Sequence, residues 1–322
     1  MADRLEYYVK LFSKLRTDRA RWKGVTITQD QAPHKPLLLL AVIEQFKQGS
    51  ININLIELTT DLSESFRLYW YRIMPPDSSG NIVMPFFHLK SDGFWQLKPY
   101  EGKQEILASK RAVRSITEMN ALAVGAELDT ELFELLQYEQ SREVLRTTLL
   151  NVYFSEDARR TLLEQEYINV EAFRYSQKLL KKIDQEDKEK ADQSETVRKQ
   201  GFRRAIITAY EHRCAMSGIR ILTPDGHTAV NAAHIVPWSV SHNDDPSNGL
   251  ALSPLCHWAF DEGLLSVDAD YRIMLSPHLR RDDNIAGDLL ALERRELILP
   301  RDENFRPDPE AVDYHRKKIL YQ

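Results

Sequence analysis

The stretch NAAHIVPWSVSHNDDPSNGLALSPLCHWAFDEG, residues 231–263, decides the fold of the C-terminal part of the chain. It predicts a strand around His234, a loop through Asn248 and a short helix that begins near Pro254. Asp261 follows His257 by four residues, so both side chains share one face of that helix. A strand that presents His234 opposite this helix would place two kinds of chemical group on either side of one substrate.

The residue types in this stretch suit hydrolysis of a phosphodiester bond. The imidazole of His234 can take a proton from water near neutral pH. His257 and Asp261 offer a nitrogen and a hard oxygen to one divalent cation, which would neutralise charge on the phosphate. Asn248 can hold the base in its orientation. Each residue alone also suits an ordinary structural role, such as a turn cap for Asp261, and only the combination indicates a nuclease.

Over residues 198–320 the sequence resembles the HNH endonucleases of the ββα-metal fold. The flanking segments that share this resemblance are Ala209-Tyr210, residues 213–218, Asp244, residues 297–300 and residues 314–316. The resemblance implies that His234 is the general base and that His257 is a metal ligand. It also implies that Asn248 orients the active-site loop or assists at the metal, and Asp261 stands where a further ligand is often found.

The chain departs from this family in two ways. Many members carry an Asp or His just before the general base, where this chain has Ala233. We therefore expect a cation with few protein ligands, completed by water and substrate phosphate or by Asn231 or Asp261; Mg²⁺ tolerates such a shell, and Mn²⁺, Ni²⁺ and Co²⁺ are alternatives. Cys214 and Cys256 are the only cysteines, so no structural zinc is expected.

The N-terminal part combines helical and strand patterns. The spacing of apolar residues predicts helices over residues 3–16, 129–150 and 156–182, and a buried helix in PLLLLAVI, residues 36–43. IVMPFFHLKSDGFWQL, residues 82–97, predicts two strands joined by a turn. The predicted fold class is therefore α+β, with an N-terminal mixed α/β domain and a C-terminal ββα-metal domain, whose Trp238 and Trp258 are expected in the core.

Two motifs of the N-terminal part suggest a binding pocket. APHKPL, residues 32–37, places His34 and Lys35 just before the buried helix, and a helix N-terminus suits a phosphate. MPFFHL, residues 84–89, places Pro85 and His88 beside aromatic residues. Together the two motifs could form a small apolar pocket rimmed by cations.

These motifs and the domain order resemble the sulfur-binding domains of phosphorothioate-dependent HNH restriction endonucleases. The resemblance rests on PHKPLLLL and on PFFHL followed by DGFW. It implies that Pro85 and His88 line an apolar cavity for sulfur, while His34 and Lys35 hold phosphate. Sulfur is larger and less hydrated than oxygen, so an apolar pocket selects it through the lower cost of desolvation. The family often has a Tyr before that Pro, where this chain has Met84.

The charge distribution allows nucleic acid as a partner. The 322-residue chain has a net charge of -5, which argues mildly against such a partner. Residues 1–114, however, contain 17 Lys and Arg against 12 Asp and Glu, and patches matter more than totals. Arg67 and Arg72 flank LYWY, residues 68–71, where they could touch DNA or lie over the core.

The segment IDQEDKEKADQSETVRKQ, residues 183–200, is too polar to fold alone and marks a domain boundary. We expect a DNA-recognition domain over residues 1–180, a charged linker over 181–200 and an HNH endonuclease domain over 201–322. No stretch approaches the ~20 apolar residues of a membrane helix, and the first residues lack a signal-peptide pattern. Together with only two cysteines, this favours a cytoplasmic protein with no membrane partner.

The sequence thus predicts a modification-dependent DNA restriction endonuclease. Its N-terminal domain would recognise phosphorothioated double-stranded DNA, and its metal-dependent HNH site would hydrolyse phosphodiester bonds. Two alternatives stay open. The N-terminal domain could read a modified base through base flipping, or the HNH fold could have decayed into a non-catalytic DNA-binding module, which Ala233 favours. A homodimer is a further option, because two strands must be cut.

Overall fold

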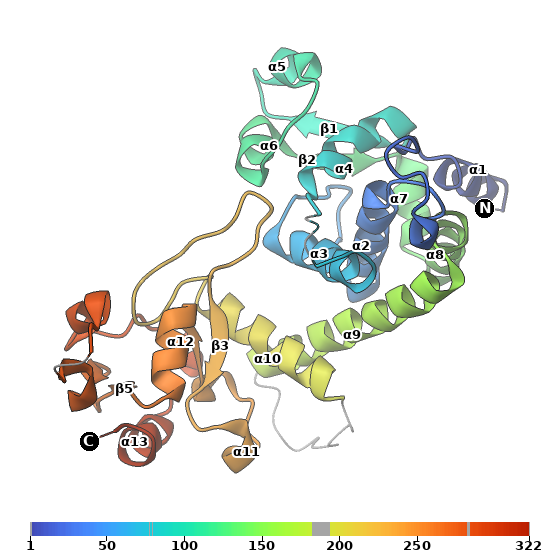
Figure 1. Cartoon of the computed structure of the whole chain (residues 1–322). Helices are drawn as coiled ribbons and strands as arrows, with labels where there is room; N and C mark the ends of the chain where they lie inside the picture. Colours follow the sequence, from blue (N-terminus) through green and yellow to red (C-terminus); the bar gives the residue numbers. More distant parts are fainter. Residues whose placement is uncertain (1, 77, 79, 182–193, 282–283, 322) are drawn as a thin grey trace. The chain divides into compact units, whose positions relative to one another are not determined.

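The computed structural model describes residues 2–76, 78, 80–181, 194–281 and 284–321 (Figure 1). Contacts within this part of the chain divide it into two compact units. Unit 1 comprises Met1–Val170 and Thr223–His227, and unit 2 comprises Glu171–Leu222 and Thr228–Gln322. The division falls inside helix α9 (Glu156–Lys181), so α9 contributes residues to both units.

Unit 1 is mainly helical and is organised around α2. Its other helices are α1 (Ala2–Phe12), α3 (Thr60–Ile73), α4 (Val83–His88), α5 (Gln104–Ser109), α6 (Ile116–Leu122), α7 (Thr130–Leu136), α8 (Glu139–Tyr153), η1 (Thr26–Thr28) and η2 (Leu89–Asp92). The predicted buried helix is confirmed as α2 (His34–Gln48), with Pro36 in its first turn. Because its apolar residues face all round, α2 packs against α3, α4 and α8.

A two-stranded antiparallel sheet lies in the same unit. Strand β1 (Trp95–Pro99) pairs with β2 (Ala123–Leu128), and Trp95 stands opposite Leu128. The segment at Ile56 forms a bridge to Ala126 of β2. A Cβ on Gly125 would lie 2.5 Å from the Ile56 carbonyl oxygen, so only glycine allows this segment to approach the strand.

Two expectations for unit 1 are wrong in detail. The first strand predicted within residues 82–97 is instead helix α4. The Oδ1 of Asn81 accepts a hydrogen bond at 2.8 Å from the amide of Val83, the first residue of this helix, and Pro85 falls in its first turn, where a missing N–H costs nothing. The single helix predicted over residues 129–150 is divided into α7 and α8.

Unit 2 contains the predicted ββα arrangement. Strand β3 (Asn231–His234) pairs antiparallel with β4 (Gly249–Leu252), and α12 (Pro254–Asp261) and α10 (Glu195–Ala209) both pack on this pair. The remaining elements are α11 (Trp238–Ser241), β5 (Leu265–Val267), β6 (Ile273–Leu275), α13 (Pro309–Lys318), η3 (Pro246–Asn248), η4 (Pro277–Arg280), η5 (Gly287–Leu292) and η6 (Glu303–Phe305). The apolar core of this unit includes Phe202, Leu250 and Phe260.

The predicted charged linker, residues 181–200, is only partly covered, because residues 182–193 lie outside the described part of the chain. The last residues of this segment are helical. Helix α10 begins at Glu195, where the Ser194 hydroxyl accepts a hydrogen bond from the Val197 amide. The polar sequence before Phe202 is therefore helical from Glu195 onwards.

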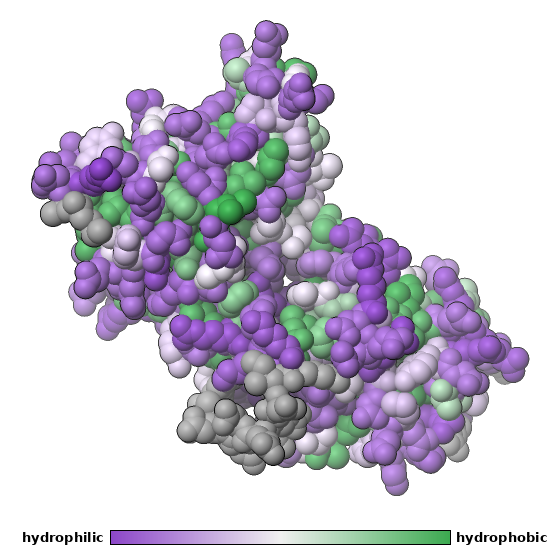
Figure 2. Space-filling view, turned by 180° about the vertical axis from the view of Figure 1, so that it is seen from behind, coloured by the Kyte–Doolittle hydropathy of each residue, from purple (hydrophilic) through white to green (hydrophobic). Residues whose placement is uncertain are grey.

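Within the described residues, no helix has the length and apolar character needed to cross a membrane. The face seen in Figure 2 is mostly hydrophilic, with hydrophobic side chains scattered in small groups. In unit 2 the exposed apolar side chains include Leu255 and Trp258, which stand on α12. The prediction that Trp258 lies in the core is wrong: Cys256, Ala259 and Phe260 take the buried face of this helix.

Candidate active site

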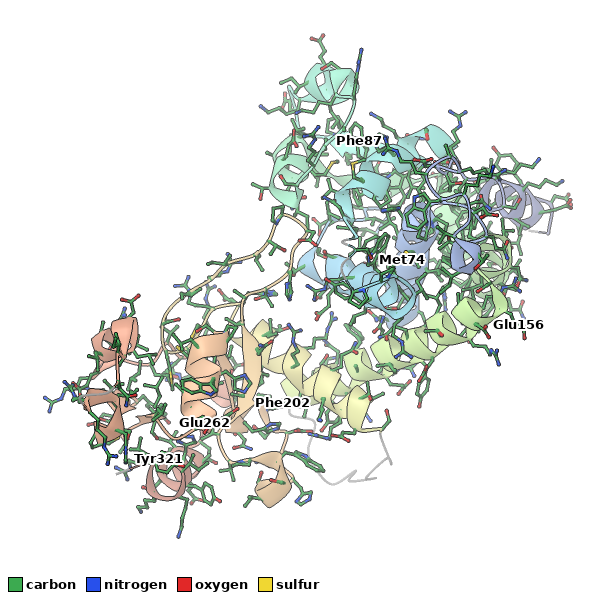
Figure 3. All side chains as sticks on the ribbon, viewed as in Figure 1. Met74, Phe87, Glu156, Phe202, Glu262 and Tyr321 are labelled. Atoms are coloured by element: carbon green, nitrogen blue, oxygen red, sulfur yellow. The ribbon has the colours of Figure 1, made fainter. Side chains whose placement is uncertain are left out.

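Strand β3 carries His234 directly opposite Gly249 of β4. Helix α10 packs so closely here that a Cβ on Gly249 would lie 2.3 Å from Ile206 Cδ1 and 2.9 Å from Phe202 Cζ. Phe202 stands on α10 (Figure 3). Because the helix comes this near, the Phe202 ring stacks on the His234 imidazole, with 3.9 Å between centroids and 7° between planes. The glycine thus allows α10 to support one face of the histidine ring.

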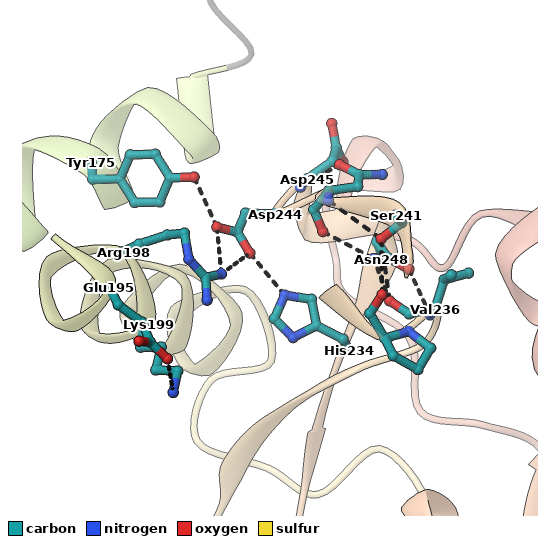
Figure 4. A network of polar contacts seen from close by, with 12 residues as sticks. Tyr175, Glu195, Arg198, Lys199, His234, Val236, Ser241, Asp244, Asp245 and Asn248 are labelled. Atoms are coloured by element: carbon teal, nitrogen blue, oxygen red, sulfur yellow. Dashed lines mark hydrogen bonds and ion pairs between the residues drawn. The ribbon is translucent and has the colours of Figure 1, made fainter. Parts of the chain in front are cut away.

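A buried carboxylate holds the edge of the same ring. Asp244, in the loop between β3 and β4, lies 2.8 Å from Nε2 of His234 (Figure 4). Arg198 donates from Nη1 to both oxygens of Asp244, at 2.9 and 3.0 Å, and the Tyr175 hydroxyl donates to Oδ2 at 2.9 Å. Burial by itself would raise the pKa of Asp244, but these hydrogen bonds outweigh it and the pKa is lowered.

The ionised Asp244 fixes the position of the proton on His234. An ionised carboxylate can only accept, so Nε2 of His234 is the donor and Nδ1 keeps the lone pair. Among the residues that the structure describes, none hydrogen-bonds to this Nδ1. The His234 side chain is 19% exposed, which leaves the lone pair accessible to water. This is the geometry that a general base requires.

Asn248 is buried behind the loop and braces it. Its Oδ1 accepts from the Val236 amide at 2.9 Å, and its Nδ2 donates to the carbonyls of Val236 and Asn243 at 3.1 and 3.0 Å. Its own carbonyl accepts from the Ile235 amide at 2.9 Å. Since only 1% of Asn248 is exposed, these contacts favour the orienting role over assistance at a metal.

His257 and Asp261 share one face of α12. Nε2 of His257 lies 3.2 Å from Oδ2 of Asp261, and their side chains are 26% and 58% exposed. Adjacent ligands of an octahedral cation with bonds of about 2.1 Å stand about 3.0 Å apart, so this pair fits two neighbouring positions of one shell. Ala233 is buried, and no group of three or more His, Cys, Asp or Glu side chains converges in the described residues. The pair therefore suits a cation whose other ligands are water and substrate phosphate.

The two cysteines of unit 2 are buried free thiols. The Ser217 amide donates to Sγ of Cys214 at 3.4 Å, and Ser253, at the N-cap position of α12, precedes Cys256 in the sequence. Each serine stands three positions from its cysteine, so the patterns are CxxS and SxxC in place of two CxxC pairs.

In unit 1 the predicted phosphate-binding residues begin α2. The His34 ring packs on Trp70, with 4.7 Å between centroids, and burial lowers the pKa of His34 to about 4. Lys35 is buried, and its ammonium donates to Asp92 and, at 3.3 Å, to the Ser91 hydroxyl. Burial lowers the pKa of Lys35, although Asp92 opposes this effect.

The predicted cavity residues lie on α4, which packs on α2. Pro85 is buried, whereas Met84, at the position often held by Tyr, is 38% exposed. Burial, followed by the positive charges of Lys35 and Lys90, lowers the pKa of His88. The structure thus brings the two predicted motifs of unit 1 to one place.

Arg67 and Arg72 lie on α3, and each has an acidic neighbour. Arg67 is 3.9 Å from Glu64, and its side chain is 14% exposed. Arg72 forms an ion pair with Glu164 of α9, and its side chain is 37% exposed. Of the two predicted DNA-contacting arginines, Arg72 is therefore the more accessible.

Tyr175, Arg198 and Phe202 contact the site although no motif in the sequence marks them. They stand on α9 and α10, far from the HNH stretch in sequence. In the sequence, Asp244 is marked only as a flanking residue that resembles the HNH family. A buried acidic residue inside the motif needs donors, and this need is the one signal that could have prompted a search for them.

The ββα unit, its held histidine and its His–Asp pair define a nuclease-type domain. Residues 214–268 match the family described as HNH endonuclease, and residues 9–168 match the family described as ScoMcrA-like, DNA sulfur-binding domain. The chain therefore joins a DNA sulfur-binding domain to an HNH endonuclease domain, as its sequence predicts.

One solved structure similar to this chain is a "Modification dependent TagI restriction endonuclease". The sequences are 25% identical, the TM-score is 0.29, and the match covers 37% of each chain. The chain thus aligns with well under two thirds of that protein's length. No curated protein matches the chain.

Proposed function

We propose that the protein is a modification-dependent DNA endonuclease that binds phosphorothioated double-stranded DNA and hydrolyses its phosphodiester bonds. In this proposal residues 1–180 recognise the DNA, residues 181–200 link the domains and residues 201–322 cleave. A DNA sulfur-binding domain and an HNH endonuclease domain in one chain support it. One observation carries the hydrolytic part: Asp244 holds Nε2 of His234, which leaves the Nδ1 lone pair accessible.

In the proposed reaction, His234 is the general base. Its Nδ1 takes a proton from a water molecule, the water oxygen bonds to phosphorus, and the bond to the leaving oxygen breaks. Solvent then protonates the leaving oxygen. Asn248 braces the loop that follows His234, and the Phe202 ring holds the imidazole plane, so the base keeps its direction.

His257 and Asp261 are proposed to hold a divalent cation, Mg²⁺ or alternatively Mn²⁺, Ni²⁺ or Co²⁺. Such a cation, when bound, neutralises charge on the phosphate and the leaving oxygen. The two residues offer one nitrogen and one oxygen on the exposed side of α12. Removal of divalent ions with EDTA is expected to abolish cleavage, and added Mg²⁺ is expected to restore it.

In the recognition domain, Pro85 and His88 are proposed to line the sulfur cavity, and His34 and Lys35 to hold phosphate. The pKa of His34, about 4, keeps its ring neutral at pH 7, so His34 would hold phosphate through a ring N–H hydrogen bond and not through a positive charge. The Lys35 ammonium has three N–H groups, and Asp92 and Ser91 use two of them. The third can donate to a phosphate oxygen.

Arg67 and Arg72 are proposed to contact the DNA backbone, and Arg72 is the more exposed of the two. Both would act as positive charges that fix the position of the duplex rather than its sequence. Since each chain supplies one HNH site, cutting both strands would be served by a homodimer with two sites.

The proposal is tested with three duplexes of one sequence, carrying a phosphorothioate, a methylated base or no modification, each incubated with the protein and Mg²⁺. Only the phosphorothioated duplex is expected to be cut. Equal cutting of the unmodified duplex would refute selective recognition, and cutting of the methylated duplex alone would favour a modified-base reader. Binding without cleavage under Mg²⁺, Mn²⁺, Ni²⁺ and Co²⁺ would favour a non-catalytic DNA-binding protein.

A further inference from the structure

We infer that Asp244, Arg198 and Tyr175 are positioning residues for His234, and that they impose the tautomer in which Nδ1 is the base. This inference rests on the proposed function, and it assigns to helices α9 and α10 a part in the reaction. Tyr175 of α9 and Arg198 of α10 both contact Asp244, and both lie outside the matched HNH segment, residues 214–268. The domain that works as a nuclease would therefore need more than its ββα unit.

The hydrogen bonds of Asp244 keep its carboxyl group deprotonated. Oδ1 is contacted by His234 Nε2 and Arg198 Nη1, and Oδ2 by Arg198 Nη1 and the Tyr175 hydroxyl. Each oxygen thus has two donors, and the side chain is 4% exposed. Asp244 is accordingly held as a carboxylate that cannot take the proton of Nε2 or bind a cation. When Nδ1 accepts a proton from water, the adjacent negative charge stabilises the imidazolium.

The donors themselves are held in place by packing. The Arg198 guanidinium lies over the Trp238 ring, 3.9 Å from its centroid, and its side chain is 13% exposed. Tyr175 reaches Asp244 because α9 comes close to α10 at Gly201. A Cβ there would lie 2.8 Å from the Ala172 carbonyl oxygen and 2.8 Å from Tyr175 Cδ1. The position of Asp244 therefore depends on contacts from two helices and on the face of Trp238.

The central test replaces Asp244 by Asn in the full-length chain. The single amide oxygen is expected to face Arg198 and Tyr175, because the guanidinium can only donate and the Tyr175 hydroxyl donates from the same side. The amide NH₂ then faces His234, so Nε2 must accept and the proton moves to Nδ1. Cleavage of the phosphorothioated duplex with Mg²⁺ is expected to fall about 100-fold or more in kcat, with little change in KM. Nitrogen-15 NMR of labelled histidines is expected to report the change of tautomer.

Asp245→Asn is the matched control. Asp245 is the next residue of the loop, and its carboxylate accepts from the Ser247 amide at 2.8 Å without contacting His234. The Asp245→Asn protein is expected to cleave at a rate within about threefold of that of the original protein. Tyr175→Phe removes one of the four donor contacts of Asp244, so its kcat is expected to fall by about threefold to tenfold.

Two results would overturn the inference. One is an Asp244→Asn protein that keeps the Nε2–H tautomer or cleaves as fast as the Asp245→Asn control. The other, decisive if Asp244→Asn does not fold, is a folded Tyr175→Phe protein whose kcat is unchanged. Failure of the proposed function would give a different result, because the protein without any substitution would not cleave the duplex. The NMR measurement would still decide whether Asp244 sets the tautomer of His234.

Discussion

Two of the histidines in unit 2, His234 and His315, have closely similar supports and opposite accessibility. Each ring is stacked on a phenylalanine, Phe202 at 3.9 Å and Phe260 at 3.6 Å between centroids. Nε2 of His315 points at the Phe260 carbonyl, 3.2 Å away, as Nε2 of His234 points at a carboxylate. Both rings therefore carry their proton on Nε2.

The difference lies at the other nitrogen. Nδ1 of His315 accepts from the Ser266 hydroxyl at 2.9 Å, and the residue is 2% exposed, so its lone pair is already used. Burial lowers the pKa of His315 to about 4. His234 has instead an accessible Nδ1 and a negative partner. Under the proposed mechanism, stacking and tautomer do not distinguish the base from the structural histidine; the access of water and the charge of the partner do.

The largest expected effect comes from His234→Ala. Cleavage of the phosphorothioated duplex is expected to fall by about 10²- to 10⁴-fold, because the group that deprotonates water is lost. The free energy of unfolding should change by about 1 kcal/mol or less, since Arg198 and Tyr175 still satisfy Asp244. Quenched single-turnover cleavage assays measure the first effect, and hydrogen exchange of peptides from β3 and β4 measures the second. Undiminished cleavage would rule out His234 as the base.

His315→Ala should show the reverse pattern. Loss of the buried ring leaves a cavity beside Phe260 and an unpaired Ser266 hydroxyl, at a cost of about 3 kcal/mol in unfolding free energy. Cleavage well below the unfolding temperature should stay within a few fold of the original rate. Hydrogen exchange in β5 and α13 reports the loss of stability. A large fall in cleavage by the folded variant would contradict a purely structural role for His315.

Acidification should lower the free energy of unfolding, because His315 is buried in its neutral form. The folded pKa of His315 is about 4 and the unfolded value is 6.5, so the unfolded chain binds the proton first as the pH falls. The stability that depends on neutral His315 is therefore fully present above about pH 6.5 and is lost between about pH 6.5 and about pH 4. Between pH 7 and pH 5 this one residue lowers the free energy of unfolding by about 2 kcal/mol. The free energy of unfolding of unit 2, measured by hydrogen exchange at several pH values, should depend less steeply on pH in the His315→Gln protein. An unchanged slope would show that His315 does not carry this linkage.

The sequence predicts the part of the site whose residues are close together along the chain. His234, Asn248, His257 and Asp261 lie within one stretch, and their chemical types restrict what they can do. The ββα order follows from the same stretch, because short strand and helix patterns alternate with loop residues. The structure places these elements as expected.

The rest of the site depends on tertiary packing that no local pattern encodes. Tyr175 meets Asp244 across 69 positions of sequence, and only the close approach at Gly201 makes the contact possible. The aromatic residues of α4 favour a strand by propensity, yet the segment is helical, with Pro85 in the first turn and the Val83 amide hydrogen-bonded to Asn81. Trp258 is exposed because smaller neighbours fill the buried face of α12. The Tyr175 contact therefore depends on a distant residue, whereas α4 and Trp258 depend on local signals that propensity and apolar character outweighed in the prediction.

The smallest effect expected from the comparison comes from the two stacked phenylalanines. Phe202→Leu and Phe260→Leu each remove a ring and keep an apolar side chain, so each should cost about 1 kcal/mol in unfolding free energy. Only Phe202→Leu should also slow cleavage, by a few fold, because the His234 plane loses its support while Asp244 still holds Nε2. Hydrogen exchange and single-turnover cleavage at one temperature separate the two quantities. Equal cleavage rates in both variants would mean that the carboxylate alone orients His234, and that the stack is a packing contact like the one beneath His315.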